Sequence, residues 1–237
     1  MSIKIGNTNI ADIKLGNQNI KKVYRGSDLI WEKQSPTPTG DNKLTYDGTE
    51  YILIDNIDPN LFITYNSGYL TQTYPLKNGG TLEINYATNR AKLTSLELHT
   101  ISKDTITGNF LYGCSGLTSL TLDLPNFTTF YYSFLSNCSG LTSLTLDLPA
   151  LQQTGSFLPN CSGLTSLTLD LPSLTSTGYF LSNCSGLTSL TLDLPNFTTC
   201  NGSFLYGCSG LTSLTLDLPS LTSTGNFLPN CSGLTSL

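Results

Sequence analysis

Cysteine and aspartate, two residue types that bind metals and take part in catalysis, recur at regular intervals in the second half of the sequence. Six of the seven cysteines lie 23 or 24 residues apart, at Cys114, Cys138, Cys161, Cys184, Cys208 and Cys231. Five aspartates keep the same spacing, at Asp123, Asp147, Asp170, Asp193 and Asp217. Rows of this kind raise three possibilities: disulfides, cation binding and paired carboxylates for acid–base chemistry.

The cysteine row is expected to be structural. Side chains at equivalent positions of stacked units lie about 5 Å apart, within disulfide range, but they point the same way, which suits the bridge dihedral badly. We therefore expect reduced, buried thiols that pack as small apolar groups. There is no C-x-x-C motif, and the single histidine, His99, has no partner motif, so no metal site is predicted. The seventh cysteine, Cys200, is assigned no role.

The aspartate row is expected to face solvent. Neighbouring carboxylates about 4.8 Å apart repel by roughly 0.9 kcal/mol in a water-like dielectric. We expect them to solubilise one face and to accept local backbone hydrogen bonds, with Ca²⁺ recruitment through carboxylate oxygens as the alternative. Glycoside hydrolysis is disfavoured, because identical surroundings cannot separate the pKa values of an acid and a nucleophile. Motifs for phosphate binding, zinc proteolysis and serine hydrolysis are also lacking, so the sequence predicts no enzyme and no cofactor.

Both rows belong to one repeat of 23 or 24 residues, whose opening leucines are Leu93, Leu117, Leu141, Leu164, Leu187, Leu211 and Leu234. In the unit that begins at Leu117, Leu120 and Leu122 alternate with Thr121 and Asp123, as the inward and outward positions of a strand do. A proline follows and ends the strand, because it lacks a backbone donor. A fixed period of this size predicts a mainly β solenoid with parallel stacked strands.

The N-terminal part is expected to hold smaller β modules that precede the solenoid. Residues 1–33 contain three ten-residue copies of strand and turn, too few to bury an independent core. Two hairpins are predicted further on, at Asp47-Gly48 and at Asn78-Gly79. Residues 1–33 are expected to form an anchoring or oligomerisation module, and residues 34–42 a linker. Residues 43–92 are expected to form a small β subdomain or solenoid cap, and residues 93–237 the solenoid.

The charge distribution excludes two classes of partner. The net charge is −5, all 11 Lys and Arg residues lie at or before Lys103, and residues 104–237 carry six Asp and no base. Nucleic-acid binding and attraction to an anionic membrane both need a cationic surface, which the C-terminal part lacks. No apolar run approaches the length of a membrane span, and the first residues lack the apolar core of a secretory signal.

The pattern F-L-x-N-C-S-G-L-T-S-L-T-L resembles the leucine-rich repeat of the BspA type over residues 93–237, with an added Asp-Leu before the proline. Members of that family are typically surface adhesion or binding proteins, so the resemblance implies a host cell-surface protein or glycan as partner. Tyr131 and Tyr132 stand out in the variable return stretch of the repeat. Exposed tyrosines suit recognition, and the equally good alternative is that they fill irregular space on the return side. The candidate outward binding face comprises Thr121, Asp123, Asp147, Asp170, Asp193, Asp217, Tyr131 and Tyr132.

Residues 3–32 are similar to short N-terminal segments of tailed-bacteriophage virion proteins, particularly fibre and tail-associated ones. The resemblance implies that Tyr24, Leu29, Ile30 and Trp31 dock the chain onto other virion proteins or into a dimer or trimer. The alternative is a β module that packs on the next domain. Because phages leave the host by lysis, a virion protein needs no signal peptide.

Three functions follow from these patterns. The first is a head or tail fibre or decoration protein on the virion surface that attaches to the host. The second is a bacterial cell-surface adhesin, and the weakest is a carbohydrate-active enzyme. The sixth copy of the repeat breaks off at "CSGLTSL". We expect either further repeats after Leu237 or another chain that covers this end, because solenoids normally carry a polar cap.

Overall fold

The computed structural model describes residues 13–15, 18–20, 22–25, 28–32, 40–62, 71–85, 89–99 and 101–235. The chain divides into two compact units, Met1–Thr39 and Gly40–Leu237, with the boundary inside the predicted linker. Among the described residues of the first unit, two antiparallel strand pairs are formed, β1 (Ile13–Leu15) with β2 (Gln18–Ile20) and β3 (Lys22–Arg25) with β4 (Asp28–Glu32).

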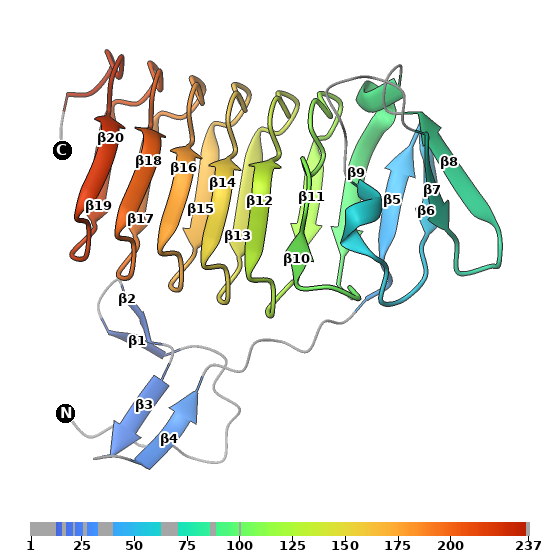
Figure 1. Cartoon of the computed structure of the whole chain (residues 1–237), viewed down its shortest axis with the longest axis horizontal. Coiled ribbons are helices and arrows are strands. Elements are labelled where there is room, and N and C mark those ends of the chain that lie inside the picture. The colour runs from blue at the N-terminus through green and yellow to red at the C-terminus, as the bar shows by residue number, and fades with distance from the viewer. Residues whose placement is uncertain are drawn as a thin grey trace. The chain divides into compact units, whose positions relative to one another are not determined.

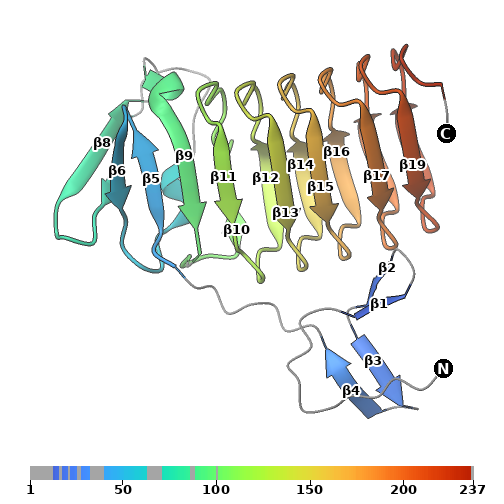
Figure 2. The same cartoon turned by 180° about the vertical axis from the view of Figure 1, so that it is seen from behind.

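The second unit is a β-solenoid whose coils present strands on two opposite sides (Figures 1 and 2). The S-L-T-L-D segments form one side, here called the leucine face, with β9 (Leu93–Leu98), β11 (Ser119–Leu122), β13 (Ser143–Asp147), β15 (Ser166–Asp170), β17 (Ser189–Asp193) and β19 (Ser213–Asp217). Equivalent residues pair in parallel, as Leu144 does with Leu167. The mainly β, parallel-stacked solenoid predicted from the repeat is confirmed.

The other side is a continuous six-stranded parallel sheet, here called the return sheet. No strand was predicted in the return stretch. Its strands are β10 (Thr105–Ile106), β12 (Thr129–Phe134), β14 (Gln153–Phe157), β16 (Ser176–Phe180), β18 (Thr199–Phe204) and β20 (Ser223–Phe227). The pairing register shifts between Phe130 and Ser133 of β12 and between Cys200 and Ser203 of β18. These bulges absorb the extra residue of the 24-residue units, so the leucine face keeps its regular register.

Leucine and phenylalanine side chains fill the space between the two sides. On β13 the inward Leu144 and Leu146 are buried, while Thr145 and Asp147 are exposed. One phenylalanine from each coil joins a stack in which neighbouring ring centroids lie 5.2 to 5.6 Å apart, formed by Phe110, Phe134, Phe157, Phe180, Phe204 and Phe227. Because each unit buries these groups only against its neighbours, stacking supplies the core.

A strained turn follows the return strand in each coil. The leucine after the stacked phenylalanine has a left-handed backbone, with φ of 57° at Leu135, and so does the residue two positions later, with φ of 60° at Asn137. Asparagine and glycine tolerate this conformation, which explains why only these two types occupy the second position. Leucine is disfavoured in a left-handed conformation, and burial of its side chain, complete in every coil but that of Leu228, holds it in place.

The cysteine row supports this turn. All seven cysteines are free, and five of the six in the row are buried, as predicted, whereas Cys231 is half-buried. Each thiol from Cys138 onward in the row donates to the carbonyl of the left-handed leucine of the preceding coil, and the Cys161 Sγ lies 3.0 Å from the Leu135 oxygen. Cys200 lies outside the row, where its Sγ donates to the Gly178 carbonyl. A thiol therefore serves here both as a small apolar group and as a weak donor.

An N-terminal β cap closes the leucine face. The predicted hairpins are present, β5 (Lys43–Tyr46) with β6 (Thr49–Ile52) and β7 (Thr71–Pro75) with β8 (Thr81–Asn85). Two 3-10 helices, η1 (Pro59–Phe62) and η2 (Arg90–Lys92), complete this part. Because β5 pairs antiparallel with β9, the parallel row of leucine strands cannot extend past β9 on this side.

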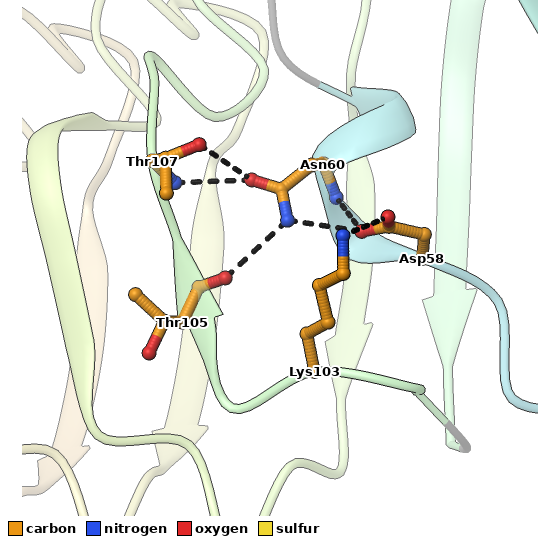
Figure 3. Close-up of polar contacts among 5 residues, drawn as sticks. All are labelled: Asp58, Asn60, Lys103, Thr105 and Thr107. Carbon is orange, nitrogen blue, oxygen red and sulfur yellow. Dashed lines mark hydrogen bonds and ion pairs between the residues drawn. The ribbon is translucent and has the colours of Figure 1, made fainter.

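The return sheet is closed at the same end by a side chain (Figure 3). The Asn60 Oδ1 accepts from the Thr107 backbone N–H at 3.0 Å, and its Nδ2 donates to the Thr105 carbonyl at 3.4 Å. The amide thus occupies the edge of β10 as a neighbouring strand would. Asp58 accepts from the Asn60 amide and from Lys103. Burial alone would raise the pKa of Asp58, but the hydrogen bonds from Lys103 and Asn60 outweigh burial and lower it.

Candidate ligand-binding surface on the return sheet

The aspartate row lies on the leucine face and forms no compact cluster. Asp147 pairs with Asp170 in register, and Asp193 with Asp217. Asp123 differs from the others because its Oδ2 lies 3.8 Å from the Nδ1 of His99. Among the residues that the structure describes, no three His, Cys, Asp or Glu side chains are grouped to hold a metal ion. The arrangement gives the Ca²⁺ alternative no support.

The predicted binding face is divided between the two sides of the solenoid. Thr121 and the aspartates lie on the leucine face, whereas Tyr131 and Tyr132 lie on β12 of the return sheet. The residues therefore do not form a single surface. Both tyrosines are about 60% exposed, with values of 62% and 61%, although they are adjacent in a strand. The β12 bulge accounts for this, since two residues occupy the place of one.

The predicted anchoring residues lie on the hairpin of the first unit. Tyr24 belongs to β3, and Leu29, Ile30 and Trp31 belong to β4, with Tyr24 and Leu29 paired in register. Their side chains lie outside the described part of the structure. The docking role remains a prediction.

Two further tyrosines border a hollow of about 320 Å³ on the return sheet. Tyr179 occupies the position before the stacked phenylalanine, where the neighbouring coils have Ser156 and Ser203. Tyr206 occupies the position after the left-handed leucine, where the neighbouring coil has Ser182. The parallel register brings these two positions together from consecutive coils. The hollow therefore has two tyrosine side chains in its lining, together with smaller side chains from neighbouring coils.

Three serines, two asparagines and Pro159 complete the lining of the hollow, and none of them carries a charge. Asn160 and Asn183 take part, and the Nδ2 of Asn183 donates to the Oδ1 of Asn160 at 2.8 Å. The Ser182 hydroxyl is buried and has no hydrogen-bond partner among the described residues. Asparagine recurs at this repeat position in Asn137, Asn160, Asn183 and Asn230, and the row is interrupted at Gly207, where a Cβ would lie 2.3 Å from the Asn183 Oδ1. Two aromatic rings, two amides and several hydroxyls thus line one depression without a charged group.

Comparison with known proteins identifies the repeat. The family described as "BspA type Leucine rich repeat region (6 copies)" matches residues 77–157 and 154–237. The chain belongs to the BspA-type leucine-rich-repeat family. A leucine-rich repeat protein from Bacteroides ovatus ATCC 8483 is similar at 14% identity over 84% of this chain and 81% of that chain, with a TM-score of 0.28. No curated protein matches the chain.

The BspA-type match confirms the resemblance seen in the repeat and begins earlier than the predicted solenoid boundary at Leu93. Leucine-rich repeats of this kind typically serve as non-enzymatic binding scaffolds, and no enzyme family is identified. None of the helices in the described ranges is long and apolar enough to cross a membrane. No comparison supports the phage-like resemblance of residues 3–32, which stays a prediction.

Sequence reasoning missed Tyr179 and Tyr206. A signal for them was present, because each replaces a serine found at the same repeat position in a neighbouring copy. What the sequence pattern lacked was the pairing of the return strands, which alone brings these two positions together.

Proposed function

We propose that this BspA-type protein is a non-enzymatic attachment protein that binds a surface ligand through its return sheet. The observation that carries the proposal is the uncharged face with Tyr131, Tyr132, Tyr179 and Tyr206, four residues that are 39 to 62% exposed. Tyrosine supplies a large amphipathic contact area at low entropic cost, and exposed clusters of it are typical of binding surfaces. Near-identical coils also favour an extended surface over a single catalytic pocket.

We further propose that the chain is a fibre or decoration protein on the surface of a phage particle, anchored by its N-terminal module to other virion proteins or to further copies of itself. The similarity of residues 3–32 to virion proteins supports this location. The division of the chain at Thr39 supports it as well, because an anchor and a binding part are then separate units. A bacterial surface adhesin is the alternative, favoured by membership of the BspA-type family.

Replacement of Tyr131 and Tyr132 by serine is expected to reduce binding to host cells at least tenfold. Exposed tyrosines at an interface contribute 1 to 2 kcal/mol or more each by truncation, and about 1.4 kcal/mol corresponds to a tenfold change. Binding of the fluorescently labelled full-length protein to cells measures the effect. Asp147→Asn with Asp193→Asn on the leucine face is the matched control. If the control variant loses binding and the tyrosine variant does not, the attachment surface is the leucine face.

Deletion of residues 1–33 is expected to abolish incorporation into particles while the solenoid still folds. The two units are compact separately, so removal of the first leaves the core of the second unchanged. Particle composition by mass spectrometry and circular dichroism of the truncated chain measure the two effects. A truncated protein that still enters particles would refute the anchoring role. Cell-envelope genes beside this gene, rather than capsid and portal genes, would favour the adhesin.

A further inference from the structure

We infer that the hollow bordered by Tyr179 and Tyr206 binds one neutral pyranose unit of a surface glycan. The inference rests on the proposed attachment function and names the class of ligand for one site on the return sheet. Its volume of about 320 Å³ lies at the lower end of the roughly 300–1,000 Å³ range of small-molecule sites. A single sugar ring fits that size, whereas a long oligosaccharide would extend beyond it.

The tyrosine rings supply the apolar part of the site. A pyranose has one face of C–H groups, and such a face packs against an aromatic ring through burial of apolar surface and weak C–H contacts. Tyr179 is 50% exposed and Tyr206 is 39% exposed, so ring surface of both is free for a ligand. They come from consecutive coils and border the same hollow, which allows a sugar to contact both.

The amides and hydroxyls between the rings supply the polar part. Each asparagine amide offers two donors and two acceptor sites. The hydrogen bond between the two residues uses one donor of Asn183 and one acceptor site of Asn160. Ser182 provides a separate indication of a ligand, since its hydroxyl is buried without a partner. Buried polar groups are nearly always hydrogen-bonded, and an unsatisfied one is destabilising. The Ser182 oxygen is covered by protein atoms, so a sugar hydroxyl in the hollow can supply the missing partner only after the Ser182 side chain rotates to expose that oxygen.

The charge and the sheet pairing argue against other ligands. No charged side chain lines the hollow, and residues 104–237 contain no base, so an acidic sugar would find no cation to pair with. An extended peptide would need a free strand edge, but β16 is paired on both sides, with β14 and with β18. A neutral sugar matches both the amide-rich lining and the lack of charge.

Titration of the full-length protein with methyl glycosides of glucose, galactose, mannose and N-acetylglucosamine tests the inference, by calorimetry and by ligand-observed NMR. We expect at least one glycoside to bind saturably with one site per chain. Tyr179→Ser and Tyr206→Ser should each weaken binding at least tenfold. Both variants should fold normally, because neighbouring coils already carry serine at these positions. Asp147→Asn with Asp193→Asn, on the leucine face, should bind as the wild type does.

Ser182→Ala separates a binding role from a structural one. Removal of a hydroxyl that has no partner in the fold should leave the melting temperature unchanged or higher, while a sugar that bonds to it should bind several-fold more weakly. Unchanged sugar affinity in this variant and in both tyrosine variants would overturn the inference.

Cell binding distinguishes failure of the sugar site from failure of the proposed function. If no glycoside binds but the protein still attaches to cells, and protease treatment of the cells removes attachment while periodate oxidation does not, the partner is a protein. The sugar inference is then wrong and the attachment function stands. If a glycoside binds through Tyr179 and Tyr206 but no cell surface is bound, the sugar site stands and the attachment function is wrong.

Discussion

A steep loss of stability between pH 9 and pH 12 is expected from the cysteine row. Burial raises the pKa of Cys114, Cys161 and Cys208 to about 12, from an ordinary value of 9.0. Burial also raises the pKa of the other thiols of the row. Between pH 9 and pH 12 the folded chain retains protons that the unfolded chain releases. The free energy of unfolding therefore falls as pH rises through this window, and the full contribution is present below pH 9.

The expected slope is large compared with the stability of a domain. Each such thiol lowers the free energy of unfolding by about 1.4 kcal/mol per pH unit within the window, so these three thiols together lower it by about 4 kcal/mol per pH unit. Native domains are stable by only about 5 to 15 kcal/mol. Urea unfolding followed by circular dichroism at half-unit steps from pH 8 to pH 12, with a reductant present, measures the slope.

A variant in which Cys114, Cys161 and Cys208 are replaced by alanine is the control for alkaline unfolding. All other ionisable groups are the same in both proteins, so the difference between the two slopes reports the replaced thiols. The variant is expected to be less stable at pH 8, because alanine removes buried sulfur and the bonds to the leucine carbonyls. Its dependence on pH should nevertheless be shallower by about 4 kcal/mol per unit. Equal slopes would show that the thiols are not responsible.

The leucine face could be predicted because its determinants are local. Alternation around Leu122 gives the strand, the fixed period gives the stacking, and Asp47-Gly48 gives a hairpin in the cap. The state of the thiols followed from the same stacking, since equivalent side chains point the same way. None of these inferences needs knowledge of a distant contact.

The return sheet could not be predicted from local pattern, because glycine is unfavourable in an isolated strand. Gly155 and Gly178 lie within β14 and β16, and a Cβ on Gly178 would lie 2.3 Å from the Gly155 carbonyl. These glycines permit close approach of neighbouring coils, whereas in sequence they resemble turn residues. The hollow was missed for the same reason, since Tyr179 and Tyr206 meet only through this pairing.

The backbones of neighbouring coils also approach closely at the Cys-Ser-Gly turn. Gly163→Ala in this turn is expected to destabilise the solenoid by about 3 kcal/mol or more. A Cβ on Gly163 would lie 2.1 Å from the backbone oxygen of Ser139 in the preceding coil. Real carbon and oxygen atoms do not approach so closely, so the two coils must separate. The obstacle is backbone, and the stacked coils on either side hold it in position, so a side-chain rotation cannot relieve the clash.

Gly48→Ala is the matched control for this substitution. Gly48 has a φ of +78°, and a Cβ there would meet no atom within 4 Å, so alanine adds backbone strain without a clash. Its expected effect is about 1 to 2 kcal/mol.

Urea unfolding of both variants measures the two losses of stability, and hydrogen exchange of Gly163→Ala should show reduced protection in the coils that contain Ser139 and Gly163. Because each coil is stabilised only by its neighbours, separating two interior coils should weaken protection on both sides of the break. Equal losses in the two variants would mean that the coils can separate at little cost, and that close approach at this turn is not what requires glycine.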